Sequence, residues 1–129
     1  MTYAFSSTAA VRNVRSKYGA VKTQIDGITF SSKAESKRYL QLKELERMGQ
    51  IDSLELQPRF ELAPGVRFSD KARATPALRY FADFSYVDHT GKRVIEDVKG
   101  FAKNTEGYRI KKHLMLAIHG IEIQEVRVK

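Results

Sequence analysis

Residues 79–99 have the sequence RYFADFSYVDHTGKRVIEDVK, in which two apolar runs flank His89-Thr90-Gly91. Two runs of this kind around a short turn that contains glycine predict a β-hairpin with strands over 79–88 and 92–99. The runs are rich in Val, Ile, Phe and Tyr, which are enriched in strands. The charged residues inside them break the apolar pattern, and departures of this kind are expected at functional sites.

The register of this hairpin brings acidic residues together. A three-residue turn pairs residue 88 with residue 92, and the same register places Asp83 directly opposite Asp97. Side chains alternate along a strand, so Asp97 and Lys99 share one face. Directly opposed Cβ atoms lie about 4.5–5.5 Å apart. The two carboxylates therefore repel each other unless one is protonated or a divalent cation lies between them. A two-residue turn would offset the pair by one position.

Asp83 followed by Asp97-Val98-Lys99 resembles the D…(D/E)-x-K signature of the PD-(D/E)XK nuclease superfamily. The stretches SKYGA, LELQPRFEL and EDVKGF are similar to those of small phage-encoded nucleases of the endonuclease I type, which resolve Holliday junctions. The resemblance covers residues from about 30 to 125. Ala82 replaces the usual proline, and the second acid is Asp rather than Glu. Glu96 competes for that role, but alternation places it on the face opposite Lys99.

This resemblance implies a restriction-endonuclease-like core, an α/β fold in which helices flank a small mixed β-sheet. It also implies metal-dependent hydrolysis of DNA phosphodiesters, with 5′-phosphate and 3′-hydroxyl products. Asp83, Asp97 and the carbonyl of Val98 would bind Mg²⁺ or Mn²⁺. Lys99 would orient or deprotonate the attacking water and stabilise the pentacovalent phosphate. The alternative is a pair of exposed strand carboxylates, with Lys99 as a phosphate contact or a salt-bridge partner of Asp83.

The expected substrate class is branched DNA, as for a Holliday junction resolvase in DNA recombination. Two strands of a junction must be cut in a related way, so we expect a homodimer. A sequence-specific or nicking endonuclease is the alternative within nucleases. The alternative from another class is a non-catalytic nucleic-acid-binding module on the same fold.

Glu35 has two interpretations. In the superfamily a glutamate from the preceding helix often completes the site, and Glu35 lies within roughly 40° of Tyr39 and Leu42 on a helical wheel, which indicates an inward-pointing acid. It would then be a catalytic or metal-binding residue. However, Ser32-Lys33-Ala34-Glu35 also fits a capping box, in which the glutamate satisfies a backbone donor.

Turn and capping residues predict the other elements. Asp26-Gly27 indicates a tight hairpin turn, glycine indicates the end of each helix, and Pro58 indicates an edge strand or a bulge. The segment 63–78 is predicted to be a basic loop, either a DNA contact or a solvated excursion. The predicted elements are a hairpin over 21–30, a helix over 32–48 ended by Gly49, a strand over 53–62, a helix over 106–119 ended by Gly120, and a strand over 121–128.

The composition fits one domain and limits its chemistry. The 129 residues are 42% hydrophobic, enough for one core. We expect a single nuclease domain over 18–129 after a flexible basic arm over 1–17. Arg12, Arg15 and Lys17 in that arm either order on a phosphate backbone or belong to a frayed terminus. The absence of cysteine excludes thiolate nucleophiles and cysteine zinc sites, so a metal would need carboxylates.

The charge indicates a polyanionic partner. Lys and Arg number 23 against 15 Asp and Glu, a net charge of +8, which fits either DNA binding or a solubilising surface. Gln57, Lys111 and Lys112 are further candidate DNA contacts, with a plain polar strand residue and a solvated helix face as the alternatives. No apolar run is long enough to span a bilayer and no signal-peptide core is present, so the expected location is the cytoplasm, that of the host if the protein is phage-encoded.

Overall fold

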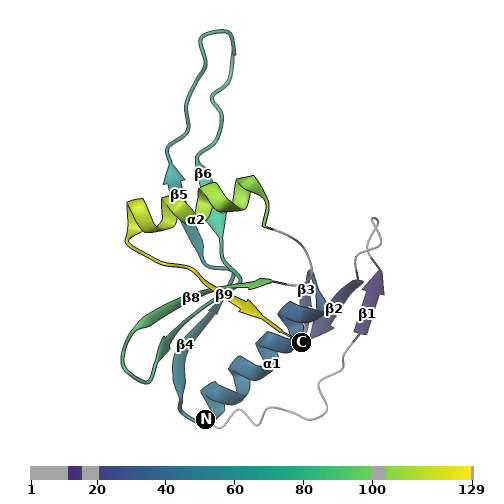
Figure 1. Ribbon diagram of the computed structural model, residues 1–129. Helices are drawn as coiled ribbons and strands as arrows, with labels where there is room; N and C mark the ends of the chain where they lie inside the picture. The colour runs from purple at the N-terminus through teal and green to yellow at the C-terminus, as the bar shows by residue number, and fades with distance from the viewer. Residues whose placement is uncertain (1–11, 16–20, 100–103, 129) are drawn as a thin grey trace.

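A four-stranded mixed sheet with two helices forms the centre of the protein (Figure 1). The computed structural model describes residues 12–15, 21–99 and 104–128. Three neighbouring strands of the sheet are antiparallel, and the last pair is parallel. A helix connects the parallel pair, as such a crossover requires. The strands are, in spatial order, β4 (Ile51–Leu56), β7 (Phe84–Asp88), β8 (Arg93–Lys99) and β9 (Gln124–Arg127), and the connecting helix is α2 (Glu106–His119). The predicted mixed α/β class is confirmed at this level.

Helix α1 (Lys33–Arg47) packs on one face of the sheet, and its predicted bounds are confirmed. The Ser32 side chain caps its first turn, and Gly49, with φ 75°, follows its end. The inner face of the helix contributes Tyr39 and Leu42 to an apolar cluster. The other buried members of this cluster are Ile25, Phe30, Ile51, Phe84, Tyr86 and Val94.

A small antiparallel sheet lies beside α1. It contains β1 (Arg12–Arg15), β2 (Val21–Ile25) and β3 (Ile28–Phe30), and the predicted Asp26-Gly27 turn joins β2 to β3. Arg12 and Arg15 were expected in a loose arm. Instead their backbone pairs with β2 as an edge strand. Lys17 lies outside the described residues.

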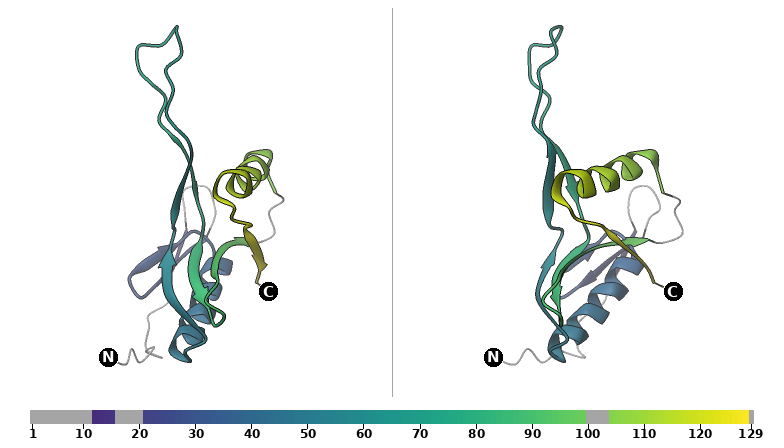
Figure 2. Two further views of the ribbon diagram at one scale, coloured as in Figure 1. Left: turned by 90° about the vertical axis from the view of Figure 1, so that its left-hand side faces the viewer. Right: turned by 60° about the vertical axis from the view of Figure 1, so that its left-hand side comes forward.

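Two strands predicted as continuous are each divided in two. The predicted strand over 53–62 becomes β4 and β5 (Arg59–Ala63), and the one over 79–88 becomes β6 (Leu78–Phe81) and β7. The break comes at Gln57, whose φ of 51° is incompatible with a regular strand. The predicted loop over 63–78 is also wrong in part. Beyond β5 and β6 the two chain segments stay side by side and project far from the body (Figure 2).

Helix α2 lies across β5 and β6 (Figure 1) and packs with Ile95 on the face of the sheet opposite α1. Thr105 caps its start, and Gly120, with φ 67°, ends it as predicted. Val94 belongs to the cluster under α1 and Ile95 to the cluster under α2, as alternation along a strand requires. The second cluster contains Phe60, Leu62, Tyr80, Ala82, Ile95, Met115 and Ile123. Within the described ranges, neither helix has the length and apolar character needed to cross a bilayer.

Candidate functional site

The β7–β8 hairpin has the predicted register. Phe84 pairs with Glu96, and the ladder continues to the turn, where the Asp88 carboxylate accepts hydrogen bonds from the backbone N–H groups of Thr90 and Lys92 at 2.9 and 3.0 Å. One residue before β7, the N–H of Asp83 donates to the carbonyl of Glu96 at 3.0 Å. The hairpin therefore delivers Asp83 to the end of β8.

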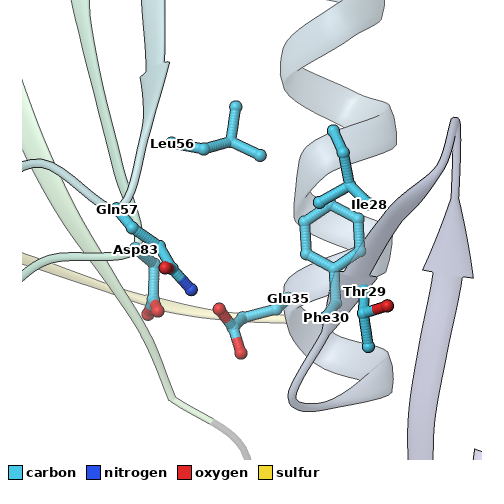
Figure 3. A pocket seen from close by; sticks show the side chains of 7 residues that line it. All are labelled: Ile28, Thr29, Phe30, Glu35, Leu56, Gln57 and Asp83. Atoms are coloured by element: carbon cyan, nitrogen blue, oxygen red, sulfur yellow. The ribbon is translucent and has the colours of Figure 1, made fainter.

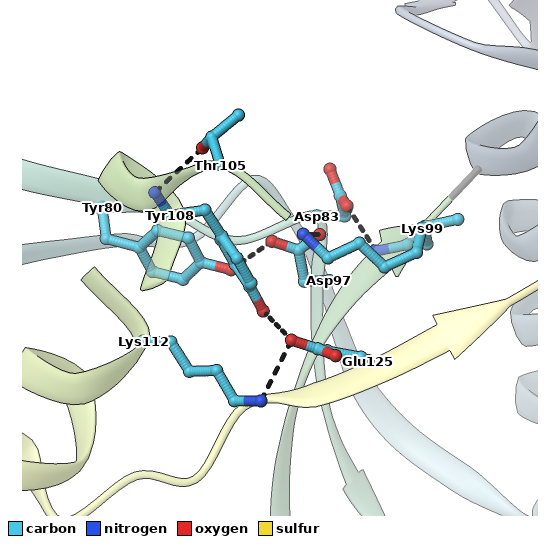
Figure 4. A network of polar contacts seen from close by, with 9 residues as sticks. Tyr80, Asp83, Asp97, Lys99, Thr105, Tyr108, Lys112 and Glu125 are labelled. Carbon is cyan, nitrogen blue, oxygen red and sulfur yellow. Dashed lines mark hydrogen bonds and ion pairs between the residues drawn. The ribbon is translucent and has the colours of Figure 1, made fainter. Parts of the chain in front are cut away.

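The side chain of Asp83 contacts the D-x-K segment directly. Its Oδ2 accepts a hydrogen bond from the backbone N–H of Val98 at 2.6 Å. Val98 stands between Asp97 and Lys99 in the sequence, so this bond joins the two halves of the predicted motif (Figure 4). Because β7 begins only at Phe84, which pairs with Glu96, Val98 has no ladder partner in β7. Its N–H can therefore donate to the Asp83 side chain.

Asp97 and Lys99 share one face of β8, as predicted. The Nζ of Lys99 lies 3.4 Å from Oδ1 of Asp97, and the Tyr80 hydroxyl donates to Oδ2 at 2.8 Å. The ammonium group also lies 3.2 Å from the centroid of the Tyr108 ring (Figure 4). Lys99 is therefore held by an acid and an aromatic face, and it forms its ion pair with Asp97 rather than with Asp83.

A second set of contacts holds α2 against β9 next to this pair. The Tyr108 hydroxyl donates to Glu125 at 2.8 Å, and Lys112 lies 3.1 Å from the same carboxylate oxygen. The hydrogen bond from Tyr108 is the main cause that lowers the pKa of Glu125. Lys112 thus has an acidic partner, while Lys111 is exposed to solvent.

Glu35 faces Asp83 across a small pocket (Figure 3). Its side chain is only 6% exposed and accepts a hydrogen bond from the Ser31 hydroxyl. The hydroxyl of Ser32 accepts the backbone N–H of Glu35 at 3.1 Å, so the cap uses the amide of this residue. Gln57 also lines the pocket, and its N–H donates to the Asp83 carbonyl at 3.0 Å. The remaining lining residues are Ile28, Thr29, Phe30 and Leu56.

These carboxylates perturb one another. Burial raises the pKa of Asp83 to about 8, and a hydrogen bond with Glu35, the charge of Glu35 and the charge of Asp97 act in the same direction. The Val98 N–H opposes this rise. Burial, reinforced by Asp97, also raises the pKa of the Tyr80 hydroxyl, which therefore stays a hydrogen-bond donor. Burial and the neighbouring acids thus favour the neutral form of Asp83 in the metal-free protein.

The raised pKa of Asp83 predicts a pH-dependent stability. The folded-state pKa of Asp83, about 8, exceeds its ordinary value of about 4, so the metal-free protein loses stability as the pH rises between these values. Asparagine can keep the bond to the Val98 N–H without a charge. In EDTA we expect Asp83→Asn to melt close to the wild type at pH 5 and several degrees above it at pH 9. Parallel melting curves for the two proteins across this range would contradict the assignment.

The donors suit a hard cation, but they are not assembled into a finished site. Asp83, Glu35 and Asp97 offer carboxylate oxygens, the ligands that Mg²⁺ and Mn²⁺ prefer. Within residues 12–15, 21–99 and 104–128, no three His, Asp or Glu side chains form a group that could hold an ion. Asp97 is engaged by Tyr80 and Lys99 instead. A cation bound here would have to compete with these two contacts.

Glu96 is separated from this chemistry by its place in the core. It is 1% exposed and accepts hydrogen bonds from Arg38 at 2.8 and 2.7 Å and from the Tyr86 hydroxyl. The expected opposite orientation of Glu96 and Lys99 is thereby confirmed. Arg38 and Tyr80 could not be predicted as partners of Glu96 and Asp97, because each lies far along the chain from the acid that it contacts.

The fold and the pocket define a small mixed α/β protein in which one end of the sheet collects acidic side chains. A family model described as "Protein of unknown function (DUF1064)" matches residues 15–127, and the chain belongs to this family. No curated protein and no solved structure matches the chain.

Proposed function

We propose that this protein is a metal-dependent endodeoxyribonuclease with a restriction-endonuclease-like core, and that it hydrolyses phosphodiesters in branched DNA. The contact between the Asp83 carboxylate and the Val98 amide carries the proposal. It supports the grouping of Asp83 with Asp97 and Lys99, while Glu35 approaches Asp83 from α1. Three acids and one amine near the end of a sheet are more than a binding surface needs.

In this mechanism the acidic residues bind the metal ion and the water, and the basic residue stabilises the phosphate. A divalent cation held by Asp83, Asp97, Glu35 and the carbonyl of Val98 would polarise the phosphate and lower the pKa of its water. Lys99 places a positive charge beside the reacting phosphate and stabilises the negative charge that develops there. Tyr80 and Tyr108 position Asp97 and Lys99. Glu35 orients the water or accepts its proton.

The charge of the chain supports a DNA substrate. A net charge of +8 favours a polyanion, and binding should weaken steeply with salt because phosphate neutralisation releases counterions. Arg12, Arg15, Lys17, Gln57, Lys111 and Lys112 remain proposed DNA contacts. A homodimer is the expected assembly for a four-way junction. A sequence-specific or nicking enzyme would use the same residues on another substrate.

A non-catalytic nucleic-acid-binding module is the second candidate. It is favoured by the engagement of Asp97 with Lys99 and Tyr80, and by the absence of a ready metal-binding group among the described residues. Incubation of supercoiled plasmid with Mg²⁺, Mn²⁺ or EDTA separates the two candidates. Nicking that needs a metal supports the nuclease, while DNA binding without any nicking supports the module. A synthetic four-way junction compared with linear duplex then tests the preference for branched DNA.

The two interpretations of Glu35 predict different variants. Because the cap uses the Ser32 hydroxyl and the Glu35 amide, Glu35→Gln should leave the melting temperature nearly unchanged. If the carboxylate serves the site, the same variant should cut plasmid about 10- to 100-fold more slowly. Ser32→Ala is the matched control, with a loss of about 1 kcal/mol of stability and normal cleavage. Normal cleavage by Glu35→Gln would return this residue to a structural role.

A further inference from the structure

We infer that the projecting arm, residues 59–81, is a grip for duplex DNA that flanks the cut site. This inference rests on the proposed function and adds to it a second DNA contact at the distal part of the arm, beyond Tyr80, which contacts Asp97 at the base. The arm consists of β5, β6 and the chain that joins them; its base packs against α2, and Figures 1 and 2 show its distal part extending beyond both helices.

The arm is an ordered ribbon rather than a slack loop. Beyond the β5–β6 ladder, Val66 and Thr75 exchange backbone hydrogen bonds at 3.2 and 2.6 Å. The Thr75 hydroxyl donates to the Val66 carbonyl at 2.9 Å. Gly65 permits this close approach, because a Cβ at that position would lie 2.5 Å from the Thr75 carbonyl oxygen. A two-stranded ribbon of this kind fits the width of the DNA major groove.

The arm also presents a surface that a polyanion would cover. It contains five basic residues, Arg59, Arg67, Lys71, Arg73 and Arg79, and two acidic ones, Glu61 and Asp70. No acidic side chain in the described part of the chain forms an ion pair with Lys71 or Arg73. Near the tip, Val66 and Phe68 are 49% and 56% exposed, and apolar groups held in water on an ordered ribbon indicate a contact surface. The charge complementarity selects DNA as the occupant.

The arm is continuous with the candidate site. Between the β4–β7 and β5–β6 ladders, the two chain segments stay paired by hydrogen bonds from Gln57 N–H to the Asp83 carbonyl and from Ala82 N–H to the Pro58 carbonyl, so the arm continues directly from the sheet. Arg73 is ten residues from Asp83 in the sequence. An extended chain of this length spans at most roughly 34 Å, at about 3.4 Å per residue. This corresponds to about ten base pairs at 3.4 Å each. The arm should therefore contact DNA up to about one helical turn from the cut.

The test compares Lys71→Ala/Arg73→Ala with a control of equal charge loss, Arg47→Ala/Lys92→Ala. The control residues are exposed and lie outside the arm, Arg47 at the end of α1 and Lys92 in the turn between β7 and β8. Arg67 is left intact because its Nε donates to the Lys71 carbonyl at 3.2 Å and orders the tip. Binding to a 40-base-pair duplex is measured by fluorescence anisotropy in EDTA, and cleavage is measured in Mg²⁺.

We expect the arm variant to bind the duplex about tenfold more weakly than the wild type, and the slope of its log affinity against log salt to be lower by about 1.8. The control variant should keep a higher affinity and a steeper salt slope than the arm variant. The kcat at saturating DNA should not change. The difference between wild type and arm variant should disappear when the duplex on one side of the cut is shortened below about five base pairs. Equal binding by both variants would overturn the inference and leave the nuclease proposal intact. A wild type that binds no duplex would overturn both. A dimeric wild type that becomes monomeric in the arm variant, in light scattering without DNA, would assign the arm to a second copy of the chain instead.

Discussion

Replacing Asp97 with asparagine should reduce Mg²⁺-dependent DNA cleavage by at least about a thousandfold while the protein stays folded. The asparagine side chain keeps an oxygen that can accept the hydrogen bond from Tyr80. It removes the negative charge that pairs with Lys99 and that the proposed cation needs. The loss should appear in kcat, because this charge acts on the reacting phosphate rather than on DNA at a distance.

The measurement is plasmid nicking by purified protein, with DNA binding recorded separately in EDTA. Asp83→Ala and Lys99→Ala should also abolish cleavage and leave DNA binding in place, because each removes one member of the same group. Metal-dependent nicking by Asp97→Asn at a rate near that of the wild type would remove the nuclease proposal. Loss of DNA binding along with cleavage would mean that Asp97 supports the binding surface instead.

Local hydrogen bonds explain why the register of the β7–β8 hairpin could be predicted. Asp88 accepts hydrogen bonds from the two amides that close the turn, and Gly91 adopts a φ of 86°, which favours glycine. These interactions involve residues within four positions of each other. Every later pair of the antiparallel ladder follows from the turn. The placement of Asp83 at the end of β8 was therefore available from the sequence.

The division of the long strands could not be predicted in the same way. Ala82 belongs to the cluster under α2 and Phe84 to the cluster under α1, so the chain changes face between them. A regular alternation would put both on one side of the sheet. At the same level the neighbouring chain segment also departs from a regular strand, because Gln57, whose N–H donates to the Asp83 carbonyl, has a positive φ. Pro58 indicates an edge strand or a bulge here, but no local signal indicates that the chain changes face, so the sequence predicts only a loop beyond it.

The side chains that contact Glu96 and Asp97 could not be predicted from the sequence either. Arg38 lies 58 residues from Glu96, and Tyr80 lies 17 residues from Asp97. Such contacts depend on how α1 and the ribbon pack on the sheet. Two adjacent acids, Glu96 and Asp97, consequently looked similar in the sequence but have different surroundings in the structure.

This difference predicts opposite results for the two neighbours. Glu96→Ala should lower the free energy of unfolding by about 3–5 kcal/mol, because it leaves the Arg38 guanidinium without its buried partner. The melting temperature should fall by roughly 10 °C or more. Asp97→Asn, one residue along, should change the melting temperature little. Differential scanning calorimetry of both variants in EDTA measures the contrast.

A double-mutant cycle shows whether the loss comes from the ion pair. Removal of Arg38 and Glu96 together should cost less than the sum of Arg38→Ala and Glu96→Ala, since no unpaired charge then remains in the core. Folded Glu96→Ala protein should retain metal-dependent cleavage at a temperature well below its melting point, because Glu96 faces α1 rather than Lys99. A stable Glu96→Ala variant that no longer cuts DNA would contradict this assignment, because Glu96 would then belong to the reacting site and not only to the core.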